Sequence, residues 1–355
     1  MKLKIFLMGI ISMLGSLTGC KATEQSGEFR SVPVDEFEKV ISDPAVVRLD
    51  VRTAGEYAEG HLAEAPCIDV LNNDFEVRAR EVLPQGKTIA LYCRSGNRSK
   101  KAAQILAAAG YDVVELESGY NGWTAAGKPV TREETDVFLS PSGTMVKMCC
   151  IKHGSLRIQF GDKWVYVDPV GKAIPPVTDY SLLPKADVIL VTHEHHDHLD
   201  KDAIAAISKQ GTILITNPRS SELLGGVDQV LKNADETEVL GLSVKAVPAY
   251  NSSADKQQFH PKGRDNGYVL DFDGFRVYIA GDTEDIDEMN SIKDVDVAFL
   301  PCNLPFTMTV NQLDHAARMV NPKVLFPYHY GTTDIIQAVE LLKNTDIDVR
   351  IRQYQ

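Results

Sequence analysis

Residues 193 to 198 constrain this chain more than any other segment, because they hold four of its nine histidines and one aspartate. The cluster follows the apolar run 187–191, which has the composition of a buried strand, so it lies on the loop that leaves a strand end. In an extended loop His193 and His195 project to one side and can hold one cation. Asp197 and His198 turn toward a second cation close by. The spacing H-x-H-x-D-H therefore predicts a metal site.

Two further donors are expected at strand ends. The apolar run 275–280 leads into Gly281-Asp282-Thr283, and the run 324–328 leads into His329. A carboxylate such as Asp282 can bridge two cations, and His329 would complete the second. Together with the histidine cluster, these residues predict a binuclear centre that can deprotonate water at neutral pH.

A second reactive group is expected at Cys93, in the segment Cys93-Arg94-Ser95-Gly96-Asn97-Arg98-Ser99. The segment joins an expected strand, 88–92, to an expected helix, 99–109, so backbone N–H groups and the helix N-terminus can surround the sulfur. This setting favours the thiolate and makes Cys93 a catalytic nucleophile, with Arg94 and Arg98 binding the substrate's oxyanion. A C-x5-R loop alone leaves phosphatase and sulfurtransferase chemistry open.

The chain divides into two parts at residues 131–144, a polar stretch rich in turn residues that we expect to be a linker. Before it, expected strands at 46–50 and 88–92 alternate with helices at 35–42 and 99–109. Such alternation predicts a parallel sheet with helices on both faces.

After the linker, residues 156–160 and 164–167 alternate in polarity around Gly161-Asp162. This pattern predicts a hairpin with one face exposed to water.

The N-terminus is expected to be an export signal. Lys2 and Lys4 precede an apolar stretch that is too short to span a bilayer comfortably, and Leu17-Thr18-Gly19-Cys20 resembles the lipobox of bacterial lipoproteins. Residues 1–20 would then be signal peptide and lipobox, with Cys20 lipidated and the protein held at a bacterial cell envelope, facing the periplasm or the exterior. The alternative is an ordinary cleaved signal with an incidental cysteine.

The net charge argues against nucleic acid as a partner, and the cysteine content argues against a fold held by disulfides. The net charge is −12 and becomes −14 once residues 1–19, with their two lysines, are removed, so we expect no nucleic acid binding. Membrane attachment would depend on acyl chains at Cys20. The other five cysteines are an odd number without regular spacing, which argues against a disulfide framework.

Residues 29–130 resemble a rhodanese domain. The likeness rests on Asp50-Val51-Arg52 through Glu56-Tyr57 and Gly60-His61, on the Cys93 loop, and on Gly119-Tyr120-Asn121-Gly122-Trp123. The resemblance implies an α/β fold and a sulfurtransferase in which Cys93 accepts sulfane sulfur from a donor such as thiosulfate. Arg94 and Arg98 would orient that donor.

Residues 145–355 resemble a metallo-β-lactamase-fold hydrolase, and in particular the branch with ascorbate-6-phosphate lactonase and N-acylphosphatidylethanolamine phospholipase D. The likeness rests on Asp168, on the cluster 193–198, on Gly281-Asp282-Thr283 and on Tyr328-His329-Tyr330-Gly331. The resemblance implies an αββα sandwich with metals at one edge. The metal ligands would be His193, His195, Asp197, His198, His260, Asp282 and His329, and Asp197 would also be catalytic.

The third ligand of the first metal is the open position, because the family's usual G-H-T triplet is absent. His260 is the candidate and Asn251 a weaker one; if neither binds, the site holds one metal firmly. The remaining histidines of this part, His153, His196 and His315, are expected to have surface or packing roles.

Three functions remain open at this stage. The first is a lipid-anchored hydrolase of an ester, lactone or phosphodiester, with one or two divalent ions, zinc first and manganese or iron as alternatives, joined to a sulfurtransferase. The second is iron-dependent oxidation of persulfides. The third is a non-catalytic surface lipoprotein that binds metal or sulfur.

Overall fold

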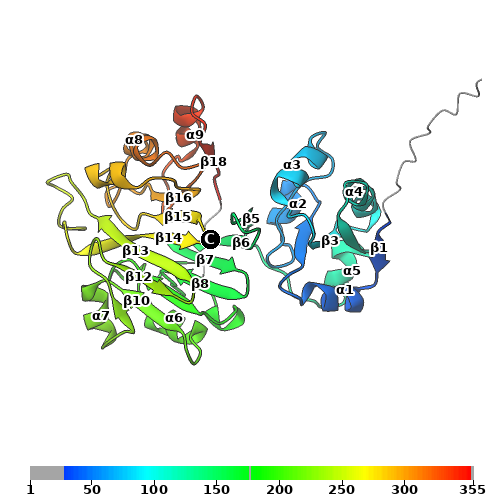
Figure 1. Cartoon of the computed structure of the whole chain (residues 1–355), viewed down its shortest axis with the longest axis horizontal. Coiled ribbons are helices and arrows are strands. Elements are labelled where there is room, and N and C mark those ends of the chain that lie inside the picture. Colours follow the sequence, from blue (N-terminus) through cyan, green and yellow to red (C-terminus); the bar gives the residue numbers. More distant parts are fainter. Residues whose placement is uncertain (1–27, 176, 353–355) are drawn as a thin grey trace, which may run out of the picture.

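The computed structural model describes residues 28–175 and 177–352, so the expected signal segment 1–20 and its Cys20 lie outside the described residues. Two units lie side by side (Figure 1), a smaller one coloured blue to cyan and a larger one coloured green to red. Within the described ranges, no helix is long and apolar enough to cross a membrane.

The smaller unit is a parallel sheet with helices on both faces, as the sequence predicts. Its strands run in the order β1-β4-β3-β2. Phe37 and Trp123 belong to the core on one face, whereas Phe75 and Leu106 belong to the core on the other. The bounds are β1 Arg30–Val32, β2 Val47–Asp50, β3 Thr88–Tyr92, β4 Asp112–Leu116, α1 Val34–Ile41, α2 Ala54–Ala58, α3 Phe75–Val82, α4 Asn97–Ala108 and α5 Gly119–Ala125.

The larger unit is the expected αββα sandwich. One sheet has the order β11-β10-β9-β8-β7-β6-β5 and the other the order β12-β13-β14-β15-β16-β17-β18. The first sheet comprises β5 Thr135–Leu139, β6 Met145–Lys152, β7 Ser155–Phe160, β8 Lys163–Val167, β9 Val188–Val191, β10 Ile213–Thr216 and β11 Gln229–Val230. The second comprises β12 Glu236–Val239, β13 Leu242–Ala249, β14 Asp265–Phe272, β15 Phe275–Ile279, β16 Val297–Pro301, β17 Val324–Tyr328 and β18 Asp348–Val349.

An apolar core between the sheets includes Ile158, Leu190, Phe299 and Phe326. Helices cover the two outer faces and lie at opposite sides of the sandwich in Figure 1. One side has η1 Tyr180–Leu182, α6 Lys201–Ile207 and α7 Pro218–Leu224, and the other has η2 Asp287–Ser291, α8 Val310–Val320 and α9 Ile336–Leu342.

Strand direction explains where the polar loops meet. β8 pairs in parallel with β9, and β15, β16 and β17 are also mutually parallel. Parallel strands end at the same edge of a sheet, so the residues that follow β8 and β9 are neighbours, and those that follow β15 and β17 lie at the same edge on either side of β16. Each sheet therefore presents its polar loops at one end.

The expected linker, 131–144, is wrong in part, because it contains the edge strand β5. Residues 135–139 pair antiparallel with β6, and the turn residues Ser140–Gly143 form the connection between the two strands. The apolar run Val137-Phe138-Leu139 lies between two polar clusters in the sequence and is too short to predict a strand by itself. Only the stretch between α5 and β5 connects the units.

The predicted hairpin is confirmed as β7 and β8, joined at Gly161-Asp162, but the prediction of a wet face is wrong. The side chains of Arg157 and Gln159 are buried on that face. The Arg157 guanidinium lies 3.0 Å from Glu133 of the connecting stretch. Burial of this face beside the smaller unit could not be read from the hairpin's own pattern.

Candidate metal centre

The histidine loop begins where β9 ends and is fixed there by Asp168. The backbone N–H and the hydroxyl of Thr192 donate to the two carboxylate oxygens of Asp168 at 2.7 and 2.6 Å. Further along, the backbone N–H of His198 donates to the backbone carbonyl of His195 at 2.9 Å, and this hydrogen bond closes a tight turn. This turn buries the His198 ring, whereas the His196 side chain stays 82% exposed, in line with its expected surface role.

Three imidazoles form one potential ligand group, His193, His195 and His260, with one nitrogen of each within 4.8 Å of the others. His260 comes from the loop before β14, and its Nδ1 lies 3.1 Å from Asp265, which Arg264 also binds. The structure thus brings His260 to the place expected for the third ligand. Asn251 lies beside it, and its backbone N–H donates to the His260 carbonyl at 2.8 Å.

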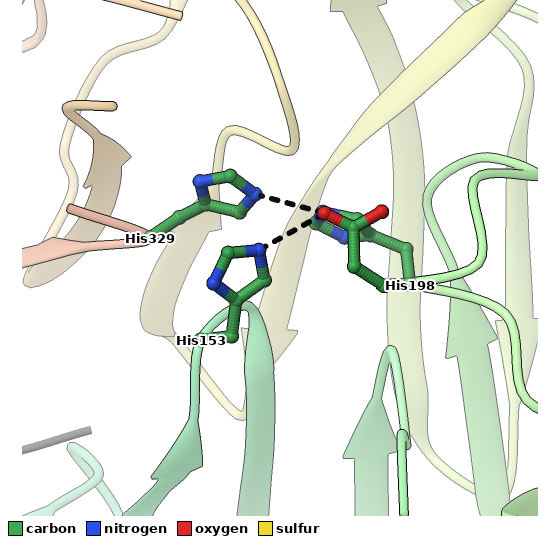
Figure 2. Close-up of side chains that lie close together, drawn as sticks. His153, His198 and His329 are labelled. Atoms are coloured by element: carbon green, nitrogen blue, oxygen red, sulfur yellow. Dashed lines mark hydrogen bonds and ion pairs between the residues drawn. The ribbon is translucent and has the colours of Figure 1, made fainter. Parts of the chain in front are cut away.

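A second group consists of Asp197, His198, His329 and His153, whose donor atoms again lie within 4.8 Å of one another. Figure 2 shows the His153 and His329 rings of this group directed at a common carboxylate. Asp197 Oδ2 lies 3.0 Å from His153 Nε2, 3.7 Å from His329 Nε2 and 4.0 Å from His198 Nε2. Sequence reasoning missed His153, which was given a surface or packing role.

The carboxylate of Asp282 lies between the two groups. Its Oδ2 is 3.4 Å from the Nε2 atoms of both His260 and His329, and its Oδ1 is 3.4 Å from His198 Nε2. His193 Nε2 is 4.0 Å from Oδ2. Asp282 therefore contacts imidazoles of both groups, as a bridging ligand would.

Outer partners orient the rings so that Nε2 faces inward. His198 Nδ1 lies 2.7 Å from Asp168, and His193 Nδ1 lies 2.9 Å from the Thr192 hydroxyl. On the inner side, the buried Nε2 atoms of His193, His198 and His329 make no hydrogen bond, and neither does Oδ1 of Asp282. Buried polar atoms without partners are costly, and divalent cations bound in the two groups would satisfy them. The residues present fit a metal ion.

The electrostatics of the site are dominated by burial and by the close approach of these groups. Burial and the neighbouring imidazoles lower the pKa of His193 well below its usual value, which keeps this ring neutral and able to bind a cation. Burial also lowers the pKa of His198, but Asp282 and Asp168 outweigh it and raise this pKa to about 10. Burial raises the pKa of Asp282, but His329 and His198 outweigh this effect, and the net result is a pKa below the usual value of an aspartate. A bound cation would take the place of the extra proton at His198.

Cys93 lies in the smaller unit, on the loop between β3 and α4, and its side chain is buried. The hydroxyl of Ser99 lies 3.3 Å from its Sγ and donates to Glu115 Oε1 at 2.6 Å. Gly119 fits closely against this loop, because a Cβ there would lie 2.5 Å from the Cys93 carbonyl oxygen. The loop is held by the segment that begins α5.

The two arginines of the Cys93 loop have different surroundings. Arg94 is exposed, whereas Arg98 forms a two-pronged ion pair with Glu56 at 2.6 and 2.7 Å. The charge of Arg98 is thus compensated within the protein. Cys67 is half-buried and directs its thiol toward the Arg52 carbonyl at 3.4 Å. Every cysteine within the described residues is free, in line with the expected lack of a disulfide framework.

Two family models match the chain. Residues 147–329, about half of the chain, match the β-lactamase superfamily domain. Residues 33–126 match the rhodanese-like domain.

Individual relatives match the larger unit. The UPF0173 metal-dependent hydrolases of Thermococcus onnurineus and Pyrococcus abyssi are 31% and 33% identical to it over 202 and 205 residues, which is 55% of this chain and 88% of each relative. A protein of Parabacteroides distasonis described as a metal-dependent hydrolase has a crystal structure that is 50% identical. That structure covers 63% of this chain and 100% of its own, with a TM-score of 0.60.

Proposed function

The chain belongs to the β-lactamase superfamily, and from this membership and the geometry of its metal centre we propose that it is a metal-dependent hydrolase. Its relatives with the same sandwich are named as metal-dependent hydrolases, and they share about a third to a half of its residues over the matched region. The proposed substrate is an ester, a lactone or a phosphodiester.

One observation carries this proposal. Imidazoles and carboxylates from five distant segments converge on one place, and four of their inward atoms, Nε2 of His193, His198 and His329 and Oδ1 of Asp282, are buried without hydrogen bonds. A purely structural polar cluster would pair these atoms with one another or with the backbone. The donor set also exceeds the two histidines and one carboxylate of non-haem iron oxygenases, which favours hydrolysis over persulfide oxidation.

The chain's own residues prepare the site for hydrolysis. A divalent ion in such a site lowers the pKa of water and polarises the carbonyl or phosphoryl group under attack. Asp168 and Asp265 hold His198 and His260 in the tautomer that presents Nε2. Asp197 is only part-buried, so its carboxylate can be reached from solvent and can accept a proton. Zinc is the first choice for the ion, and manganese and iron also suit mixed nitrogen and oxygen ligands.

A second function, sulfur transfer, is favoured by the setting of Cys93. Its loop leads directly into α4, and Gly96, in the left-handed region, allows the turn. In the proposed reaction the Cys93 thiolate attacks the outer sulfur of thiosulfate, and the S–S bond breaks with its electron pair leaving on sulfite. The persulfide then passes its outer sulfur to a thiol or to cyanide.

The hydrolase proposal is tested by elemental analysis of the purified protein and by assays on ester, lactone and phosphodiester substrates. We expect one or two divalent ions per chain and a hydrolysis rate at least about 100-fold lower in His195→Ala. His315→Ala is the control, because this imidazole lies on α8 and binds Asp285 at the surface. Absence of bound metal, or equal turnover in His195→Ala, would contradict the proposal.

The alternative of persulfide oxidation is tested on the same preparation. Oxygen consumption with glutathione persulfide, together with bound iron, would favour that alternative. The sulfur-transfer proposal has its own test, thiosulfate-to-cyanide transfer, which we expect to disappear in Cys93→Ser.

The proposed location is the bacterial envelope, with lipid attached to Cys20. The support is the motif Leu17-Thr18-Gly19-Cys20 behind an apolar segment. Labelled palmitate should be incorporated by the wild type and not by Cys20→Ala. Equal labelling of the two proteins would contradict lipidation at this residue.

A further inference from the structure

We propose that His153 is a ligand of the metal ion held by Asp197, His198 and His329. This inference rests on the proposed metal centre and adds to it a ligand from a different part of the fold. His153 lies on the turn between β6 and β7, forty residues before the histidine cluster. Besides the bridging Asp282, the ion at this position would then have four side-chain ligands from three segments.

The first support is the position of its ring nitrogen. His153 Nε2 lies 3.0 Å from Asp197 Oδ2, closer than either of the other two imidazoles of this group. Donors about 2 Å from one ion lie roughly 3 to 4 Å from one another. The separations in this group, all within 4.8 Å, approach that arrangement. In Figure 2 the His153 ring points at the same carboxylate as the His329 ring does.

The second support is the backbone that carries the ring. His153 and His329 both have a positive φ, 47° and 48°, which is uncommon for residues other than glycine. Their backbones are joined directly, since the N–H of His329 donates to the carbonyl of His153 at 3.2 Å. Their rings lie 3.6 Å apart between centroids. Strained conformations of this kind persist where the surroundings require them, and here they direct both imidazoles to one point.

The third support is Gly154, which follows His153. A Cβ at this position would lie 2.7 Å from Cε1 of His198. The turn therefore approaches the His198 ring as closely as a backbone can, and this approach brings His153 into the ligand group.

Apart from Asp282, which both ions would share, the number of side-chain ligands would distinguish the two ion positions. The group His193, His195 and His260 supplies three side chains of its own, whereas the His153 position would have four. Catalytic zinc sites keep a place open for water or substrate, and filled sites hold their ion more firmly. We therefore expect the ion beside His153 to be the more firmly bound of the two.

The test uses the full protein, stripped of metal and reloaded with Co²⁺ alone. Wild type, His153→Ala, His153→Gln and the surface control His315→Ala are compared by metal content, by competition with a chelator and by visible absorption of the bound Co²⁺. We expect both His153 variants to bind one Co²⁺ at least about tenfold more weakly and to have an altered absorption spectrum. His315→Ala should match the wild type. The glutamine variant retains most of the side-chain volume, so it serves if the alanine variant does not fold.

Two results would overturn the inference. One is unchanged affinity and spectrum in both His153 variants. The other is a weaker affinity with an unchanged Co²⁺ spectrum, which would mean that His153 positions Asp197 by a hydrogen bond and does not coordinate the ion. A wild type that binds no Co²⁺ and no other metal would instead refute the proposed function itself.

Discussion

Single protons decide the chemistry of both sites at the scale of residues. At the metal centre, Asp168 binds Nδ1 of His198 and leaves Nε2 free to face an ion. Beside Cys93, the Ser99 hydroxyl has one proton and two neighbours, a sulfur and the carboxylate of Glu115. The carboxylate is the stronger and closer acceptor, so it takes that proton and the sulfur receives none.

This arrangement predicts that Glu115 restrains the reactivity of Cys93. In Glu115→Gln a buried negative charge near the sulfur becomes a neutral amide, so the negative charge of the reacting sulfur is no longer opposed. At neutral pH we expect iodoacetamide to modify Cys93 about tenfold faster, because removing a unit charge a few ångströms away is worth roughly 1 to 3 kcal/mol. Mass spectrometry of the Cys93 peptide measures the rate.

Glu117→Gln is the matched control, since this neighbouring carboxylate is exposed. It should leave the rate unchanged. A slower reaction in Glu115→Gln would mean that the carboxylate promotes the reaction of Cys93, which contradicts the expected restraint.

The ion pair between Glu56 and Arg98 predicts a dependence of stability on pH. Its hydrogen bonds to Arg98 lower the pKa of Glu56 from 4.5 to about 2. Because the folded pKa lies below the unfolded one, the pair stabilises the fold above about pH 4.5, and this contribution is lost as the pH falls toward 2. At pH 7 we expect Glu56→Gln to lower the free energy of unfolding by about 1 to 2 kcal/mol.

Urea unfolding of both proteins across this pH range gives the measurement. The difference between them should shrink below pH 4.5, and Glu59→Gln, at the exposed C-cap of the same helix, should behave as the wild type. A difference that stays constant down to pH 2.5 would disprove the assignment.

Local sequence patterns predicted the ligand candidates well where the donors are close in sequence or follow a clear strand. The cluster from His193 to His198 and the strand ends before Asp282 and His329 are of this kind, and the structure brings them together. His153 was missed because its partner Asp197 lies 44 residues away and no ligand spacing marks it. His153 is recognised from the folded structure, in which the strained turn after β6 brings its ring to Asp197.

At the scale of elements, the turn between β6 and β7 is the most demanding connection of the metal centre. Gly154 has no room for a side chain, because His198 Nδ1 would lie 3.0 Å from a new Cβ as well as Cε1 at 2.7 Å. This turn contacts two other segments of the centre. The backbone N–H of His329, after β17, donates to the His153 carbonyl, and His153 Nε2 lies 3.0 Å from Asp197 of the histidine loop.

Gly154→Ala is therefore expected to displace the His198 ring and to reduce the metal content of the protein. Overpacking of this kind should also lower the free energy of unfolding by about 1 to 3 kcal/mol. Gly55→Ala is the control, because a Cβ at that position of α2 meets no atom within 4 Å. Elemental analysis and urea unfolding check both variants; full metal content in Gly154→Ala would show that the turn can move away from His198.

The sequence predicted the positions of strands and helices better than the burial of their faces. β3 has the bounds expected from its apolar run, and the alternation of strands and helices gave the parallel sheet. The pattern around Arg157 gave the hairpin but not its burial, because the covering residues are distant in sequence. β5 was missed since an edge strand needs only a few apolar residues.

At the scale of the whole molecule, the two units are joined by a continuous interface. Val137 and Met145, from the sandwich, pack in the core of the smaller unit. Lys147 of β6 lies 3.9 Å from Glu64 of the smaller unit, and Arg157 binds Glu133. Shared apolar and charged contacts of this kind couple the folding of neighbouring units.

We therefore expect a single unfolding transition in calorimetry. Glu133→Ala would leave the buried guanidinium of Arg157 without its carboxylate partner, at a cost of about 3 kcal/mol, and should separate the transition into two. The neighbouring acid Glu134 makes contacts of its own and is unsuitable as a control. The exposed acid Glu36 is used instead, and Glu36→Ala should unfold as the wild type does. Two resolved transitions in the wild type would contradict the coupling.

The place of β5 at the edge of its sheet also decides where the polypeptide can be shortened. A fragment that begins at residue 145 would lose β5 and leave β6, which is buried along its whole length, with a bare row of backbone donors and acceptors. Such an edge recruits strands from other molecules and leads to aggregation. A fragment that begins ahead of Thr131 would keep this edge capped and is the better starting point for producing the sandwich by itself.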